Sequence, residues 1–227
     1  MTNKINKKYI ASIIDHTLLK ANVSKIDIIR LCEEAKKYKF AAVCINPYYV
    51  GLAKENLKKT NIKIATVVGF PLGSTTKIAK LIETRDVIAQ GADEIDMVIN
   101  ISALKSGDEF YVFDEIKSLR EATYGKILKV IIETAYLSRE EKIKACKIAK
   151  EANVDFVKTS TGFAPQGATV EDVKLMKTVV GNKIGVKASG GIKDLKTAIE
   201  MIKAGATRIG TSSGVAIIKG KSGENSY

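Results

Sequence analysis

The chain has few of the residues that build disulfide frameworks and metal centres. Its 227 residues include three cysteines, three prolines and one histidine. The cysteines, at positions 32, 44 and 146, are widely spaced within apolar segments, which fits neither a disulfide framework nor a zinc site. Because there is a single histidine and no carboxylate cluster at ligand spacing, the sequence predicts no bound metal.

The sequence also shows no pattern typical of an interdomain linker, a leader peptide or a membrane span. No stretch rich in proline or serine divides the chain, so one domain over residues 1–227 is expected. Residues 1–8 are polar, and no apolar run approaches the ~20 residues of a membrane span. We therefore expect a cytoplasmic protein with no membrane partner. The polar residues 219–227 predict a flexible C-terminal tail.

The charge is strongly positive, with 37 basic and 25 acidic residues and a net charge of +12. The lysines are scattered through helical segments, and there is no arginine cluster, basic aromatic stripe or DNA-binding motif. This distribution favours a solvated lysine-rich surface that attracts an anionic substrate. The competing hypothesis, a nucleic-acid-binding protein, would require binding that weakens steeply with salt.

Strand-like and helix-like runs alternate along the whole chain. Eight runs have the character of strands, and most of them are nearly continuous in valine, isoleucine and alanine, which is typical of parallel strands buried on both faces. They predict strands at residues 13–18, 41–45, 62–68, 94–99, 128–133, 155–158, 184–188 and 208–211. Helical spacing and capping residues, such as the capping box that begins at Ser138, occupy the intervals.

This alternation predicts an α/β fold, a compact (β/α)8 TIM barrel. A doubly wound open sheet would concentrate its glycine and polar signals at one switch point. Here such signals follow most of the strands. We therefore prefer the barrel, whose active site lies at the carboxyl ends of the strands.

Two lysines, Lys158 and Lys187, end neighbouring apolar strands. A lysine with a pKa of ~10.4 is less than about 0.1% neutral at pH 7, and bringing its pKa near 7 requires about 4–5 kcal/mol. A second ammonium ~4 Å away, at an effective dielectric constant of about 20, supplies roughly 4 kcal/mol of repulsion. The pair therefore predicts one amine neutral enough to form a Schiff base with a carbonyl substrate.

Schiff-base chemistry also needs an acid or base, for which Asp96 is the main candidate. This carboxylate lies inside an apolar strand, where it could relay protons or partner a lysine. Asp15 and Thr17, at the end of the first strand, are weaker candidates. In the alternative, Asp96 is a structural ion pair for one lysine and the other lysine binds phosphate. His16, without a serine or cysteine motif, is expected to be structural or to support a neighbouring site residue.

Glycine and serine are abundant in the loops that follow the last three predicted strands. The loops after strands seven and eight are the usual phosphate site of a barrel, where backbone N–H groups at helix starts point at the anion. The alternative is that these glycines merely turn the chain. The residues expected around a phosphate are Gly162, Gly190, Gly191, Lys193, Gly210, Ser212 and Ser213.

Through these residues the chain resembles the deoxyribose-phosphate aldolases, a family of class I, Schiff-base aldolases. The resemblance covers nearly the whole chain from Asp15 onward. It runs through the motifs Asp15-His-Thr-Leu-Leu19, Ala42-Val-Cys-Ile-Asn-Pro47, Val67-Val-Gly-Phe-Pro-Leu-Gly73, Gly91-Ala-Asp-Glu-Ile-Asp-Met-Val-Ile-Asn100, Lys129-Val-Ile-Ile-Glu-Thr134, Phe156-Val-Lys-Thr-Ser-Thr-Gly-Phe163 and Val186-Lys-Ala-Ser-Gly-Gly-Ile192.

The resemblance implies reversible cleavage of 2-deoxy-D-ribose 5-phosphate to D-glyceraldehyde 3-phosphate and acetaldehyde, with no cofactor or metal. It implies that Lys158 is the Schiff-base lysine, a choice between the two lysines that the residues alone leave open. Lys187 would perturb its pKa and join the proton relay, and Asp96 would donate and accept protons through water. A homodimer is the family-like expectation. The alternative function is another phosphate-binding barrel, an aldolase or isomerase for a different sugar phosphate.

At three positions, the residue in this chain must be compared with those found in family members. Phe163 stands where some members have a second lysine, and Lys193 replaces a common arginine, which removes bidentate contact with phosphate. In some relatives a C-terminal tyrosine folds over the active site and helps proton transfer. Tyr227 could do the same here, or belong to a disordered end.

Overall fold

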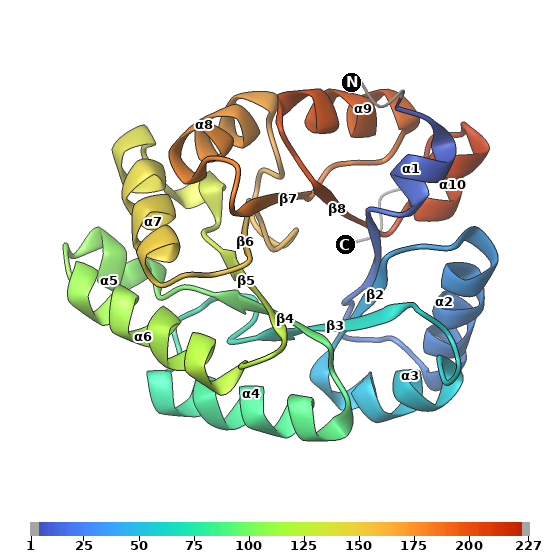
Figure 1. The fold of residues 1–227 in the computed structure, drawn as a ribbon, viewed down its shortest axis with the longest axis horizontal. Coiled ribbons are helices and arrows are strands. Elements are labelled where there is room, and N and C mark those ends of the chain that lie inside the picture. The colour runs from blue at the N-terminus through green and yellow to red at the C-terminus, as the bar shows by residue number, and fades with distance from the viewer. Residues whose placement is uncertain (1–4, 224–227) are drawn as a thin grey trace.

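Eight parallel strands close into a barrel in the computed structural model, which describes residues 5–223 (Figure 1). Each strand pairs with its neighbour in sequence, and β8 pairs with β1 through Ile14 opposite Ile209. Closure leaves no free strand edge, so both sides of each strand are hydrogen-bonded. The strands are β1 (Ile14–Leu18), β2 (Ala42–Ile45), β3 (Lys63–Val68), β4 (Glu94–Val98), β5 (Ile127–Ile131), β6 (Phe156–Lys158), β7 (Gly185–Ser189) and β8 (Arg208–Thr211).

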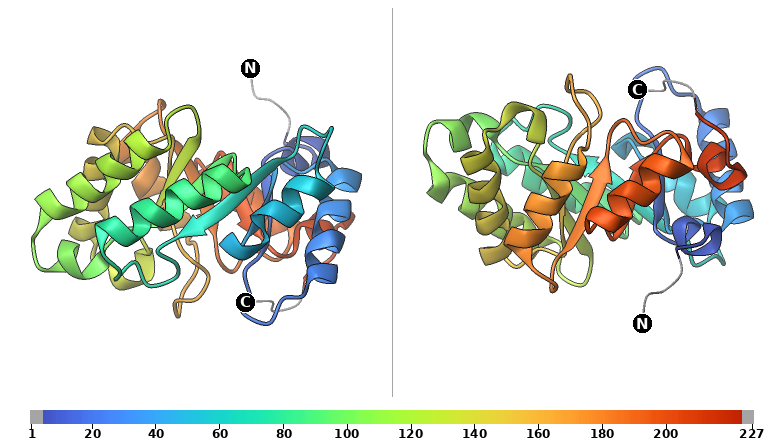
Figure 2. Two further views of the ribbon diagram at one scale, coloured as in Figure 1. Left: turned by 90° about the horizontal axis from the view of Figure 1, so that it is seen from below. Right: turned by 90° about the horizontal axis from the view of Figure 1, so that it is seen from above.

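Helices surround this barrel, and α4 runs along the outside of β3 in the side view (Figure 2). The helices are α1 (Lys7–Ala11), α2 (Lys25–Tyr38), α3 (Val50–Asn56), α4 (Lys77–Gln90), α5 (Ile101–Lys105), α6 (Glu109–Ala122), α7 (Arg139–Glu151), α8 (Val170–Val180), α9 (Leu195–Ala204) and α10 (Gly214–Lys219), with short 3₁₀ turns at Pro47–Tyr49 and Thr134–Tyr136.

The predicted barrel is confirmed, and every predicted strand forms with each end within two residues of its expected place. The capping box at Ser138 also forms. The backbone N–H of Glu141 donates to the Ser138 hydroxyl at 3.2 Å, and the Glu141 carboxylate accepts from the Ser138 N–H at 2.7 Å. These bonds satisfy N–H groups that the start of α7 would otherwise leave unpaired.

The main apolar core lies between the barrel and its helices, while charged groups occupy part of the barrel interior. Successive side chains of a strand point to opposite faces. On β4, Ile95 and Met97 therefore join the outer core, whereas Glu94 and Asp96 point inward and contact side chains from other strands. Buried charges are costly unless they are paired, so this alternation dictates a network of ion pairs inside the barrel.

Part of the predicted tail is bound to the body of the protein. Lys219 ends α10, the Lys221 N–H donates to the Ala216 carbonyl at 2.9 Å, and the Gly223 N–H donates to the Lys193 carbonyl at 2.9 Å. Tyr227 lies outside the described residues. Over residues 5–223, no helix combines the length and apolar character needed to cross a membrane.

Candidate active site

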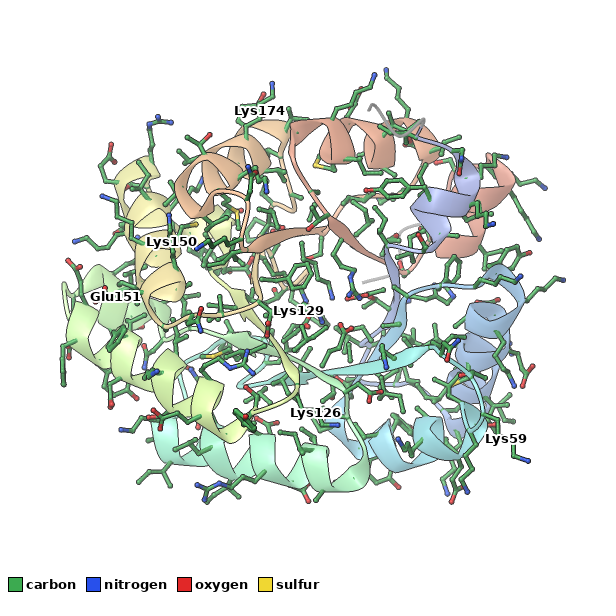
Figure 3. All side chains as sticks on the ribbon, viewed as in Figure 1. Lys59, Lys126, Lys129, Lys150, Glu151 and Lys174 are labelled. Atoms are coloured by element: carbon green, nitrogen blue, oxygen red, sulfur yellow. The ribbon has the colours of Figure 1, made fainter. Side chains whose placement is uncertain are left out.

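Seven charged side chains from six strands meet inside the barrel. Figure 3 shows one of them, Lys129, within the ring of strands, whereas Lys59 and Lys174 lie at the periphery. Apart from Arg208, whose side chain is 13% exposed, each member is at most 2% exposed. The seven are Asp15 on β1, Glu94 and Asp96 on β4, Lys129 on β5, Lys158 on β6, Lys187 on β7 and Arg208 on β8.

Asp96 binds both of the predicted lysines through one carboxylate oxygen. The Nζ atoms of Lys158 and Lys187 each lie 2.8 Å from Asp96 Oδ2. The other oxygen, Oδ1, accepts a hydrogen bond from Lys129 Nζ at 2.7 Å. In this structure Asp96 thus pairs with both lysines, and not with one of them alone.

Asp96 is one of six charged groups that ion pairs join into a closed ring. Lys187 donates to Asp15 Oδ2, and Asp15 Oδ1 accepts from Arg208 Nη1 at 2.6 Å. Arg208 reaches Glu94 at 3.2 Å, and Glu94 contacts Lys129 Nζ at 2.6 Å, which returns the ring to Asp96. Every carboxylate in the ring therefore has at least two cationic partners.

Sequence reasoning missed Lys129, Glu94 and Arg208 as members of the site. Lys129 carried a usable signal, because it is a lysine in the middle of the apolar strand Ile127–Ile131, and the argument applied to Lys158 holds for it equally. Arg208 carried none. It begins β8, at the end of the strand away from the predicted site, and only the folded structure shows its side chain reaching Asp15.

The two predicted lysines have opposite pKa shifts. Burial lowers the pKa of Lys158 most; Asp96 opposes this effect, and the Lys187 ammonium reinforces it. Burial also acts against the charge of Lys187, but Asp15 and Asp96 outweigh it and hold its pKa well above the usual value. The sequence argument assigned most of the activation to the second ammonium, whereas in the structure desolvation is the larger cause.

Asp96 is an anion in this site. Its burial acts to raise its pKa, but Lys129, Lys158 and Lys187 outweigh that effect and hold the pKa of Asp96 well below its usual range. The pKa of Asp15 is also lowered, because Lys187, Lys129 and Arg208 outweigh its burial. Both carboxylates therefore accept hydrogen bonds at neutral pH.

An apolar cluster lines the interior beside the lysines. It consists of Leu19, Ala42, Cys44, Ala65 and Val67, with Phe70 packed against it. Burial raises the pKa of the Cys44 thiol, which therefore stays neutral next to Lys158. These apolar side chains contribute to the desolvation that disfavours an ammonium on Lys158.

The other two residues predicted on β1 point to different partners. The Thr17 hydroxyl donates to the Asp15 carbonyl at 2.8 Å, and Thr17 borders a cavity of about 400 Å³ that Ser212 also lines. His16 points out of the barrel, where its Nε2 lies 2.7 Å from Glu34, and this placement agrees with a structural histidine. In the described part of the chain, no three His, Cys, Asp or Glu side chains are arranged to hold a metal ion.

The loop after β6 is fixed at the mouth of the barrel by Glu133 and by an aromatic pair. The buried Glu133 carboxylate accepts hydrogen bonds from the N–H and the hydroxyl of Thr161, and burial raises its pKa. Phe163 packs edge-on against Phe70 with ring centroids 5.3 Å apart. The loops after β1 and β6 project from the same end of the barrel (Figure 2).

The predicted phosphate residues fall into two groups. Gly190 has a φ of +83°, and a Cβ there would lie 2.9 Å from the Cα of Gly167, so only glycine fits. Gly191 and Gly162 also have positive φ values, and Gly162 lies close to Gly190. Within residues 5–223, no group accepts a hydrogen bond from the N–H of Gly190 or Gly191. These donors remain available to a ligand.

The remaining phosphate candidates lie on the next strand and loops. Gly210 is inside β8 rather than in the loop after it, and a Cβ there would lie 2.9 Å from Lys187 Cε, so this glycine makes room for the lysine. Ser212 and Ser213 border a cavity of about 400 Å³ that Lys219 also lines. Lys193 is half-buried, and its carbonyl oxygen accepts a hydrogen bond from Gly223.

The chain is similar in sequence to a known family of aldolases. Residues 9–220 match the family described as DeoC/LacD family aldolase. The chain is 58% identical over 217 residues to the deoxyribose-phosphate aldolase of Caldicellulosiruptor saccharolyticus, covering 94% of this chain and 99% of that protein. It is 60% identical over 213 residues to the protein of the same name from Caldanaerobacter subterraneus, covering 92% of each.

The fold is also similar to that of a solved aldolase structure. The deoxyribose phosphate aldolase of Aeropyrum pernix, described as having a unique tetrameric structure, superposes with a TM-score of 0.88 at 32% identity. The match covers 94% of this chain and 91% of the other.

Proposed function

Because the chain belongs to the DeoC/LacD family of aldolases, we propose that it reversibly cleaves 2-deoxy-D-ribose 5-phosphate to D-glyceraldehyde 3-phosphate and acetaldehyde. The reaction proceeds through a Schiff base on Lys158. The observation that carries this proposal is the buried contact of Lys158 and Lys187 with one oxygen of Asp96, beside an apolar wall. That arrangement supplies an amine of lowered pKa and a second, more strongly stabilised ammonium, each within hydrogen-bonding distance of the same carboxylate.

The numbers of ion pairs that the two lysines make support Lys158, rather than Lys187, as the nucleophile. Lys187 binds the carboxylates of Asp15 and Asp96. Among the residues that the structure describes, the carboxylate of Asp96 is the sole ion-pair partner of Lys158, which shares the contacted oxygen with Lys187. An ammonium with fewer anionic partners is less stabilised against the loss of its proton. Lys158 is therefore the group that becomes neutral.

In the first half of the reaction, neutral Lys158 attacks the C1 aldehyde of the open-chain sugar. Loss of water from the carbinolamine leaves an iminium, which is an electron sink. A water molecule next to the Asp96 carboxylate takes the proton of the C3 hydroxyl. The C2–C3 bond then breaks, its electron pair moves into the enamine, and D-glyceraldehyde 3-phosphate departs.

The second half of the reaction regenerates the free amine of Lys158. The enamine takes up a proton at C2 through the relay of Asp96, water and Lys187, and hydrolysis of the resulting iminium releases acetaldehyde. Lys187 suits this relay because its ammonium already donates a hydrogen bond to Asp96 at 2.8 Å. Asp96 suits it because three lysines keep it an anion, which can accept hydrogen bonds from the water and from Lys187 and so align them for proton transfer.

The phosphate of the substrate binds over the loops after β7 and β8. The N–H groups of Gly190 and Gly191, which have no acceptor among the described residues, support this part of the proposal. Lys193 contributes a cation from the same loop as the glycines, and Ser212 and Ser213 contribute donors from the next loop. Backbone donors in such loops suit a phosphate dianion.

Reductive trapping tests the proposed function. The protein is incubated with acetaldehyde and sodium borohydride, and the modified lysine is mapped by mass spectrometry. We expect the adduct on Lys158, loss of activity in Lys158→Met, and unchanged activity in the control Lys174→Met, which alters an exposed lysine on α8. An unlabelled Lys158, or a fully active Lys158→Met variant, would refute the proposal. Turnover of another carbonyl donor in place of acetaldehyde would indicate a different sugar-phosphate aldolase.

We also propose that the enzyme is a homodimer. Ile78 and Ile82 lie one turn apart on α4 and are 65% and 63% exposed, which leaves an apolar stripe on the outside of the barrel. Light scattering during gel filtration should give twice the chain mass of 24.6 kDa, and Ile82→Glu should lower it. A single-chain mass contradicts the dimer, and four chains would match the description of the Aeropyrum pernix relative instead.

A cytoplasmic location is proposed as well. Cys32, Cys44 and Cys146 are free and buried, which suits a reducing compartment. Fractionation of the source cells, with immunodetection of the protein in each fraction, tests this location.

A further inference from the structure

We infer that Glu94, Lys129 and Arg208 are positioning residues that set the charge of Lys158 without touching the substrate. The inference rests on the proposed role of Lys158 as the amine that forms the Schiff base. It starts from the closed ring of ion pairs, in which Asp15, Glu94 and Asp96 alternate with Lys129, Lys187 and Arg208. Lys158 is attached to this ring through Asp96 alone.

The ring is electrically balanced before Lys158 is counted. It contains three carboxylates and three cations, and each cation contacts at least two of the carboxylates. A proton on Lys158 therefore adds an unbalanced positive charge to a buried site. In a medium of low dielectric constant such a charge is strongly disfavoured. The balance of the ring thus favours a neutral Lys158.

Two groups outside the ring, Cys44 and Glu133, also lie near Lys158. Cys44 on β2 faces it as a neutral thiol, whose pKa is raised by burial. Glu133, after β5, is another acid near Lys158; its carboxylate accepts hydrogen bonds from the N–H and the hydroxyl of Thr161, and within residues 5–223 no ion pair joins it to Lys158. Lys187 and Asp96, on β7 and β4, are members of the ring itself. The net charge around Lys158 is therefore governed by the ring.

Lys129 has a second, geometric effect on the same amine. By occupying Asp96 Oδ1 at 2.7 Å, it leaves only Oδ2 for Lys158, which shares that oxygen with Lys187. Without Lys129, Oδ1 would be open to Lys158, and Glu94 would lose its closest cation. Both changes would stabilise an ammonium on Lys158.

Removing a cation and removing an anion from the ring should therefore move the pKa of Lys158 in opposite directions. Lys129→Met leaves the ring with a net negative charge and should raise this pKa. Glu94→Gln leaves it with a net positive charge and should lower it. We expect shifts of about one pH unit each, at the lower end of the range for a charge about 4–6 Å away because both groups act through Asp96. The double variant removes both charges and should restore the wild-type value.

Two measurements on the full chain test the inference. NMR of protein labelled with ¹³C and ¹⁵N in its lysine side chains reports the pKa of Lys158, whose signal is assigned by its loss in Lys158→Met. The pH dependence of borohydride trapping with acetaldehyde reports the neutral amine through its chemistry. We expect both midpoints to rise in Lys129→Met, to fall in Glu94→Gln and to return to the wild-type value in the double variant.

A role confined to stability would not produce this pattern. Shifts of the same sign in both single variants, unchanged midpoints, or a double variant that stays shifted would overturn the inference. The NMR titration makes its failure distinguishable from that of the proposed function, because it follows the pKa of Lys158 whether or not the lysine is trapped.

Arg208 provides a second pair of variants, should Lys129→Met fail to fold. Arg208→Met removes a ring cation whose side chain is 13% exposed, more than that of Lys129, and should raise the Lys158 midpoint. Arg208→Lys keeps the charge and should remain close to wild type. Equal midpoints in these two variants would likewise overturn the inference.

Discussion

The sharpest test of the site is Asp96→Asn, which removes the shared anion and keeps its shape. Lys158 Nζ lies 2.8 Å from Asp96 Oδ2. At an effective dielectric constant of about 20, two unit charges at that separation attract by about 6 kcal/mol, which favours the ammonium form of Lys158. The amide and the surrounding side chains recover part of this energy, so we expect the pKa of Lys158 to fall by about 1–3 units.

The variant should therefore separate Schiff-base formation from turnover. A lower pKa leaves more neutral Lys158 at pH 7, so borohydride trapping should persist and its acid midpoint should move to lower pH. Turnover should fall by about 10²–10⁴-fold, because the proton relay through the carboxylate is gone. The assays are the trapping rate against pH and the initial rate of 2-deoxy-D-ribose 5-phosphate cleavage.

Stability provides a third measurement on the same variant. Breaking a buried ion pair from one side costs about 3–5 kcal/mol, because the remaining ammonium groups lose their partner. For a chain of this size that corresponds to a fall in Tm of roughly 10 °C. The matched control is Asp114→Asn, which disrupts the more exposed pair with Lys77 and should change neither activity nor trapping. Wild-type turnover in Asp96→Asn, or trapping lost along with turnover in a folded protein, would refute the reasoning.

Three other predictions concern the glycines and the effect of acid. Gly210→Ala would put a Cβ 2.9 Å from Lys187 Cε and displace this lysine, so kcat should fall about tenfold or more. The circular dichroism spectrum should stay native, and an unchanged kcat would contradict the close packing. Gly190→Ala would be strained at φ +83° and would collide with Gly167, which should displace the backbone donors proposed for the phosphate. The KM should therefore rise more for 2-deoxyribose 5-phosphate than for unphosphorylated 2-deoxyribose. Equal increases in KM would argue against a phosphate site there. The pKa values of Asp15 and Asp96 are lowered in the folded state, so their contribution to stability is present above the unfolded value of about 3.9 and is lost as the pH falls below it. Urea unfolding should therefore show stability dropping below pH ~4, with a smaller drop in Asp96→Asn.

The barrel could be predicted because its signals are local. A parallel strand that is buried on both faces is nearly continuous in apolar residues over a few positions, and helices are marked by caps such as Ser138 with Glu141. Lys158, Lys187 and Asp96 could be found for the same reason, since each interrupts an apolar strand. Their meeting followed from the barrel prediction, which brings side chains from different strands into one interior.

The electrostatics of the site could not be predicted in this way. A pKa depends on all charges nearby and on the exclusion of water, and both depend on distances between strands far apart in sequence. The sequence argument therefore overrated the repulsion from Lys187 and underrated burial as the cause of the low pKa of Lys158. It also placed Gly210 in a phosphate loop, because nothing local reveals that Lys187 needs its space.

By itself, then, the sequence determined the barrel, the two lysines with their carboxylate, and the loops that follow the strands, because apolar periodicity and chain punctuation are properties of neighbouring residues. Only the tertiary structure decided which charges face one another. It closed Asp15, Glu94 and Asp96 into a balanced ring with Lys129, Lys187 and Arg208, and it left Lys158 attached to that ring by a single contact. The physical reason is that Coulomb energy and desolvation act through space, so the difference in anionic partners between Lys158 and Lys187 is set only when the strands have closed around them.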